Sequence, residues 1–168
     1  MERDEGRGME NSINIKNKKA SFEYSFIDKY VAGLQLTGTE IKSIREAKSN
    51  INDAFCVFLP ARMNGVNRSG GNDELFIRNM HIAPYFNGTY NNVGEKRDRK
   101  LLLNKRELDK LQGKLKDKGL TIIPLRLFIS EKGYAKLEIA LAKGKKLYDK
   151  RDDIKKKDIE RETNRSLK

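Results

Sequence analysis

The stretch LTIIPLRLFISEKGYAKLEIAL, residues 120–141, contains the clearest structural signal in the sequence. It consists of two largely apolar runs, 120–129 and 134–141, which Glu131-Lys132-Gly133 separate. Two such runs joined by a short segment containing glycine are typical of a β-hairpin. Pro124 has no N–H group to donate, so it predicts a sheet edge or a bulge in the first strand.

Further strands are expected on the N-terminal side of this hairpin. Phe22, Tyr24 and Phe26 alternate with polar residues, which predicts a strand beginning at Ala20 with its aromatic rings on one face. Gly33 predicts a bend, a bulge or a close backbone approach within another strand. The remaining apolar runs predict strands at 30–36, 54–59, 74–77 and 79–85.

Two short helices are expected between the strands. Thr37 with Glu40, and Asn104 with Glu107, have the spacing of a capping box, in which two side chains bond the free N–H groups at a helix start. Apolar residues at helical intervals follow each box, and Gly119 is a typical helix stop. The predicted helices span 38–47 and 105–118.

Polar segments flank and interrupt this pattern. We expect 1–16 to be a disordered N-terminal extension, and 60–73 and 86–99 to be flexible loops. The C-terminal segment 147–168 is highly charged and has too few apolar residues to offset the entropy of ordering it alone. It is predicted to be a basic tail, disordered when free and helical on a partner, which leaves 17–146 as the folded domain.

About six short strands with a helix between strand sets predict a mainly β fold. The nearest standard architecture is an OB-like closed or nearly closed β-barrel with flanking short α-helices. Such barrels commonly bind nucleic acids, although a fold alone does not determine function.

The charge balance points to an anionic partner. Among 168 residues, Lys and Arg number 36 against 24 acidic residues, which gives a net charge of +12. This excess favours nucleic acid, an anionic membrane surface or an acidic protein as partner. No apolar run approaches the roughly 18 residues that span a bilayer, and the polar start MERDEGRGMENS predicts no targeting peptide. Cys56 is the one cysteine, so a disulfide framework is excluded and a reducing cytosol is expected.

Catalytic and metal chemistry finds little support in the sequence. Zinc sites need several Cys and His ligands, whereas the chain has only Cys56 and His81. Nothing places a nucleophile beside His81, and 143–146 lacks the spacing of a phosphate-binding P-loop. We therefore expect a non-enzymatic protein with no cofactor and no metal. A metal-dependent nuclease using tail carboxylates such as Asp152-Asp153 is the least favoured alternative.

Several motifs occur together in a specific order. They are NKKA (17–20), AGL (32–34), TGTEIKS (37–43), NMHI (79–82), PY (84–85), RKLLLNK (99–105), GLT (119–121), PL (124–125), AKGKK (142–146) and DKR (149–151). In this order the sequence resembles the SmpB family, the SsrA-binding proteins of bacteria. The resemblance covers nearly everything from residue 17 to the tail.

The resemblance implies a cytoplasmic, monomeric protein with an OB-like barrel, one copy per RNA, that binds the tRNA-like domain of transfer-messenger RNA (tmRNA, SsrA RNA). It implies that the complex reaches stalled ribosomes, where trans-translation rescues the ribosome and tags the peptide. The ribosomal contacts would be the decoding centre and the messenger channel, which the tail enters as a helix. A general OB-type RNA-binding or ribosome-binding protein without a dedicated RNA remains the main alternative.

The resemblance also implies two sets of contact residues. The implied RNA-binding residues are Gly33, Gly38, Glu40, Lys42, Asn79, His81, Lys100, Leu102, Asn104, Lys105, Lys143, Lys145 and Lys146. The implied ribosome-contacting tail residues are Tyr148, Asp149, Lys150, Arg151, Lys155, Lys156 and Lys157.

Several of these residues have a structural interpretation as well. Glu40 and Asn104 are equally well explained as capping partners, His81 as a structural imidazole and Tyr148 as an anchor to the barrel. The chain departs from the family at Tyr148, where histidine is frequent, and at Val31, where an acidic residue is frequent. Its 60–73 segment is also longer than the family pattern.

Overall fold

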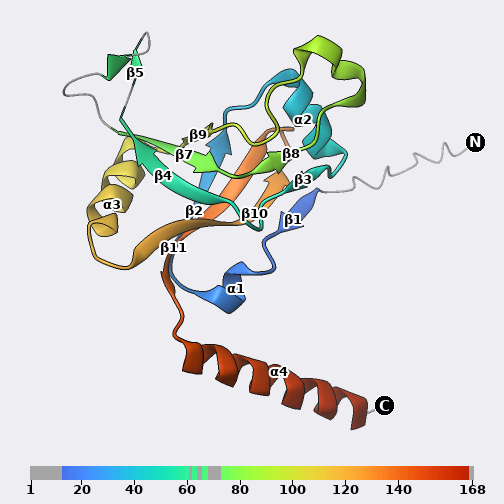
Figure 1. Cartoon of the computed structure of the whole chain (residues 1–168), viewed down its shortest axis with the longest axis vertical. Helices are drawn as coiled ribbons and strands as arrows, with labels where there is room; N and C mark the ends of the chain where they lie inside the picture. The colour runs from blue at the N-terminus through green and yellow to red at the C-terminus, as the bar shows by residue number, and fades with distance from the viewer. Residues whose placement is uncertain (1–12, 61, 64–65, 68–72, 167–168) are drawn as a thin grey trace, which may run out of the picture.

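The computed structural model describes residues 13–60, 62–63, 66–67 and 73–166. Within this part of the chain, six antiparallel strands close into a barrel (Figure 1). The strands follow the order β10-β11-β2-β9-β7-β4 around the barrel, and Ile122 of β10 pairs with Cys56 of β4 to close it. Their bounds are β2 Tyr24–Leu34, β4 Phe55–Leu59, β7 Glu74–Arg78, β9 Arg99–Leu102, β10 Leu120–Ile129 and β11 Ala135–Gly144. The predicted OB-like closed barrel is confirmed.

The predicted hairpin of β10 and β11 is confirmed. A turn joins the strands, in which the Ser130 N–H donates to the Tyr134 carbonyl and Gly133 takes a φ of 83°. The pairing register shifts between Pro124 and Arg126, so proline occupies a bulge where no ladder donor is needed.

The structure corrects the N-terminal prediction in three places. Ala20 begins a short helix, α1 (Ala20–Glu23), and not a strand, because the Asn17 side-chain oxygen accepts the Lys19 and Ala20 N–H groups and starts a turn. The strand expected to begin at Ala20 and the strand expected at 30–36 form a single strand, β2. Strand β11 pairs with β2 from Tyr24 to Gly33, and this pairing continues across a register shift. A further strand, β1 (Asn14–Lys16), pairs with β10, so ordered structure begins before residue 17. Residues 1–12 lie outside the described part.

Both predicted helices form, with both capping boxes in place. They are α2 (Gly38–Arg45) and α3 (Lys105–Leu115), each a few residues shorter than expected. Figure 1 shows α3 and α2 at opposite ends of the barrel. Ile44 of α2 and Leu111 of α3 are fully buried and contribute to the barrel core.

The region 79–102 differs most from the prediction. The strand expected at 79–85 is only the bridge β8 (His81–Ile82), which pairs with β3 (Ser49–Asn50). The loop expected at 86–99 contains a 3-10 helix, η1 (Phe86–Asn91), and ends in β9, which the sequence did not predict. Within the segment 60–73, β5 (Arg62–Met63) pairs with β6 (Val66–Asn67), and much of the remainder lies outside the described part.

The C-terminal segment is a helix, α4 (Leu147–Ser166), that lies beside α1 and apart from the barrel (Figure 1). The expectation that it is disordered without a partner stays a prediction. None of the helices described has the length and apolar character needed to cross a membrane.

Candidate nucleic-acid interface

The predicted RNA-binding residues fall into two groups in the fold. The barrel group comes from β2, α2, the β7–β8 connection, β8, β9 and the start of α3. It consists of Gly33, Gly38, Glu40, Lys42, Asn79, His81, Lys100, Leu102, Asn104 and Lys105. The tail-root group lies where β11 leads into α4 and consists of Lys143, Lys145 and Lys146.

Glu40 is the centre of a buried ionic cluster in the barrel group. Only 4% of its surface is exposed, and it accepts hydrogen bonds from Arg97 Nη2 at 2.6 Å and from Arg99 Nε at 2.8 Å. It also accepts the Thr37 N–H at 2.9 Å, as the capping box requires. The capping interpretation of Glu40 is therefore confirmed, and its carboxylate faces its own cations and not solvent.

The electrostatics of this cluster follow from its burial and its hydrogen bonds. Burial by itself raises the pKa of Glu40, but the hydrogen bonds from Arg97 and Thr37 and the charge of Arg99 outweigh it, so the pKa is lowered. Burial lowers the pKa of Arg99, and Glu40 opposes that effect. Both groups are thus held in their charged forms by each other.

Arg99 connects several segments that are distant in sequence. Its guanidinium is fully buried and donates to the carbonyl oxygens of Met80 at 2.7 Å, Arg97 at 3.1 Å and Glu95 at 3.0 Å. The segment before β9 is therefore tied to the β7–β8 connection and, through Glu40, to α2.

The basic cluster 96–100 is consequently less available than its sequence indicates. Arg97 and Arg99 share the single carboxylate of Glu40, and Lys100 Nζ lies 2.5 Å from Glu74. The local sequence contains no signal for this arrangement, because Leu101, Leu102 and Leu103 are all apolar and show no alternation that would point Arg99 inward.

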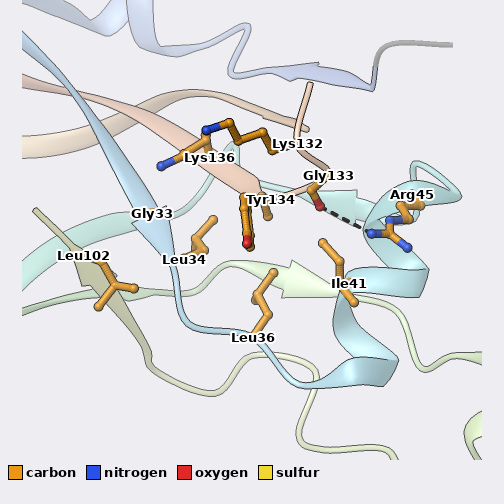
Figure 2. A pocket seen from close by; sticks show the side chains of 11 residues that line it. Gly33, Leu34, Leu36, Ile41, Arg45, Leu102, Lys132, Gly133, Tyr134 and Lys136 are labelled. Carbon is orange, nitrogen blue, oxygen red and sulfur yellow. Dashed lines mark hydrogen bonds between the residues drawn. The ribbon is translucent and has the colours of Figure 1, made fainter. Parts of the chain in front are cut away.

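Gly33 and Leu102 face each other across β2 and β9. A Cβ atom at Gly33 would lie 3.4 Å from the Leu102 Cβ, so the predicted close approach is made to β9. Beside this pair lies a groove between β2, α2 and the β10–β11 turn (Figure 2). Its volume is about 460 Å³. Its rim includes Tyr134, which is 66% exposed, and Arg45, whose Nη2 donates to the Gly133 carbonyl at 3.3 Å.

The remaining polar members of the barrel group lie at element ends. Asn79 has a φ of 57°, which asparagine tolerates better than most residues. His81 Nε2 lies 2.9 Å from Glu95, and Lys42 Nζ lies 5.2 Å from the centre of the Tyr85 ring. Asn104 caps α3, as the structural interpretation predicted.

Two members of the barrel group have no internal role that the structure shows. Lys105 is exposed in the first turn of α3. A Cβ atom at Gly38 would meet nothing within 4 Å among the described residues, so their packing does not require a glycine there.

Lys145 fastens the tail-root group to α1. Its N–H donates to the Glu23 carbonyl at 2.9 Å, and its Nζ donates to the Ser21 carbonyl at 3.0 Å and pairs with Asp153 of α4. The hydrogen bond from Lys145 lowers the pKa of Asp153 against the raising effect of desolvation. Lys145 is therefore mostly engaged within the chain, whereas Lys143 and Lys146 are solvent-accessible.

The tail residues are largely exposed. Tyr148 is 60% exposed, which speaks against its interpretation as an anchor to the barrel. The ammonium groups of Lys150 and Lys157 lie 5.9 and 6.0 Å from the centre of the Phe22 ring on α1. Asp149 accepts the Lys146 N–H at 3.3 Å at the start of α4, and Arg151, Lys155 and Lys156 are exposed.

The described residues contain no cluster of three or more His, Cys, Asp or Glu side chains that could hold a metal ion. Cys56 is buried in the barrel core, and burial raises the pKa of its thiol, which keeps the group neutral.

Comparison with known proteins assigns the chain to a family. The family model described as SmpB protein matches residues 14–168. The chain belongs to the SmpB family. An SsrA-binding protein of Phocaeicola vulgatus is 56% identical over 156 residues, which cover 93% of this chain and 96% of the relative. An SsrA-binding protein of Thermosipho africanus is 46% identical and covers 90% of this chain and 94% of the relative.

A solved structure of a family member shares the fold. It is described as "tmRNA-SmpB: a journey to the center of the bacterial ribosome" and is 41% identical in sequence, with a TM-score of 0.61. The match covers 80% of this chain and 86% of that chain. The family resemblance read from the ordered motifs is thereby confirmed.

Proposed function

We propose that this chain binds the tRNA-like domain of tmRNA and delivers it to stalled ribosomes for trans-translation in the cytoplasm. The observation that carries the proposal is the match to the SmpB family over residues 14–168, together with relatives named SsrA-binding proteins. These names describe a binding protein, which agrees with the expectation of a non-enzymatic chain.

The barrel group provides a surface suited to a folded RNA. Lys42 and Lys105 would contact phosphates, since each phosphate that a cation neutralises releases counterions and favours binding. Asn79 and His81 would bond sugars or base edges, and the glycine at Gly38 leaves room for a phosphate backbone. Glu40, Arg97 and Arg99 would contribute indirectly, because their buried cluster holds α2 and the segment before β9 in place.

The tail would act separately, by entering the empty messenger channel of a stalled ribosome. In support, α4 has no apolar face that it must bury within the chain, and its basic side chains suit a channel lined by RNA. Exposed Tyr148 could stack on a ribosomal base there.

A comparison of RNA affinities tests the proposal. We expect the chain to bind a transcript of the tRNA-like domain more tightly than an ordinary tRNA at matched salt, and both affinities to fall steeply as salt increases. Equal affinity for the two RNAs would favour a general RNA-binding protein. Cleavage of either RNA that a chelator abolishes would instead support the nuclease alternative.

A further inference from the structure

Two aromatic rings project from η1 with almost no contact to the rest of the chain. Phe86 is 89% exposed and Tyr90 is 92% exposed, more than any other large apolar side chain described. Figure 1 shows η1 as part of a lobe beside α2. Burying two large rings would stabilise the free chain, and their exposure forgoes that stabilisation. Their exposure is therefore evidence for a partner that covers them. We call residues 85–92 the aromatic lobe.

The lobe is rigidly built. The Asn92 side chain accepts the Tyr85 N–H at 3.0 Å and donates to the Tyr85 carbonyl at 3.0 Å, which closes the loop at its base. Gly88 packs beneath it, and a Cβ atom there would lie 2.5 Å from Asn92 Oδ1. The Gly88 N–H also donates to the Tyr85 carbonyl at 2.8 Å. The two rings therefore project from a segment that is closed by hydrogen bonds at its base.

Part of this frame is strained. Thr89 has φ 40° and ψ −117°, a conformation that a β-branched residue rarely adopts. Such strain costs of the order of 1–3 kcal/mol and persists where the surrounding contacts enforce it. Phe86 and Tyr90 lie on either side of this strained residue.

The surroundings of the rings indicate what they bind. The lobe reads YFNGTYNN, so the rings stand among amide and hydroxyl groups and not within a continuous apolar patch of the kind that forms the centre of a protein–protein interface. Lys42 lies against Tyr85, and Thr39 Oγ1 donates to the Asn91 carbonyl at 3.4 Å, so α2 and its cation adjoin the lobe. Aromatic rings next to amides and cations are the groups that recognise unpaired RNA bases.

We propose that Phe86 and Tyr90 stack on unpaired loop bases of the tRNA-like RNA whose phosphates the barrel group binds. The inference rests on the proposed function, because Lys42 is shared between that surface and the lobe. The lobe thus adds base stacking to a surface otherwise composed of phosphate and sugar contacts, and it favours RNAs whose loops present free bases.

The test uses the full chain with both rings changed together. Phe86→Ala with Tyr90→Ala should weaken binding of the tRNA-like transcript by about tenfold or more, and should leave binding of a loop-free RNA duplex unchanged. Phe86→Leu with Tyr90→Leu should lose as much, because leucine is apolar but cannot stack, whereas the pair of tryptophan variants should bind at least as well as the wild type. Ile159→Ala, which removes an exposed apolar side chain that no proposed contact uses, is the matched control and should not change this binding.

Anisotropy titrations at one salt concentration, with circular dichroism as a check on folding, give the readout. Wild-type affinity in the alanine pair, or in the leucine pair, would overturn the inference while leaving the proposed function intact. Failure of the proposed function has a different signature: the wild type would bind tRNA and the tRNA-like RNA equally, while the alanine pair would still lose affinity for both looped RNAs.

Discussion

The barrel and α4 belong to one chain but are stabilised in different ways. In the barrel, Leu137 and Ile139 are fully buried within a closed ring of strands. In α4, by contrast, the apolar side chains are 47–75% exposed; these are Leu147, Tyr148, Ile154 and Ile159. The contacts that hold α4 near the barrel are ionic or cation–π, between Lys145 and Asp153 and between two lysines and Phe22.

Because they are stabilised differently, the barrel and α4 can act independently. Burial of the barrel core contributes most of the folding free energy, whereas exposed charge pairs contribute little and are weakened by salt. A helix of this kind opens locally without unfolding the barrel. The barrel can therefore hold an RNA rigidly while the tail changes its position or conformation.

Removing the tail should have the largest effect of the changes that separate the barrel from α4. Deleting 147–168 should abolish peptide tagging on stalled ribosomes, yet leave the thermal unfolding of the barrel and its affinity for the tRNA-like RNA largely unchanged. The reason is that α4 buries almost no apolar surface against the barrel. A tagging assay with ribosomes stalled on truncated messages, run beside RNA titrations, measures both. Loss of RNA binding on truncation would show that the two regions are not separable.

Neutralising Glu40 should destabilise the barrel itself. Glu40→Gln leaves buried Arg99 without its counter-charge, so we expect the free energy of unfolding to fall by about 3–5 kcal/mol in urea titrations. The matched control is Glu160→Gln in α4, an exposed position where the change should stay within about 0.5 kcal/mol.

The pH dependence gives an independent check on Glu40. Its pKa is lower in the folded chain than the ordinary value of 4.5, so its stabilisation is fully present above pH 4.5 and is lost as the pH falls through the lowered value. The stability difference between the wild type and Glu40→Gln should accordingly shrink as the medium is acidified below pH 4.5. A difference that is independent of pH would mean that packing, and not charge, explains the loss.

The smallest effect is expected where the two regions meet. Asp153→Asn removes the carboxylate that pairs with Lys145, so the amide groups of α4 should exchange hydrogen faster while those of the barrel stay unchanged. Asp158→Asn is the matched control, since Asp158 pairs with Arg161 on the same helix and not with the barrel. Equal exchange rates in the two variants would show that the Lys145–Asp153 pair does not hold α4.

Features that depend on neighbouring residues were predictable from the sequence. The hairpin of β10 and β11, with its bulge after Pro124, follows from apolar runs and the chemistry of proline. The capping boxes at Thr37 and Asn104 follow from a spacing of three residues. The ordered motifs added the family and the closed barrel.

Features that depend on distant partners were not predictable in this way. Ile27, Asp28 and Lys29 resemble a break between two strands, but β11 supplies partners on both sides and makes β2 continuous. The short strand β9 forms because β2 and β7 offer it hydrogen-bonding edges.

The candidate site shows the same division. Its residue types, and the net charge of +12 that favours an RNA partner, could be read from the sequence. Which charges are free depends on the tertiary structure, because Glu40 meets Arg97 and Arg99 across 57 and 59 residues of chain; Arg99 is fully buried there and Arg97 stays 33% exposed. Likewise, Phe86 and Tyr90 belong to a segment that was expected to be a flexible loop, whereas the structure places them on η1 with both rings in solvent. Local sequence determines which elements can form, whereas burial and pairing in three dimensions determine which side chains remain available to a partner.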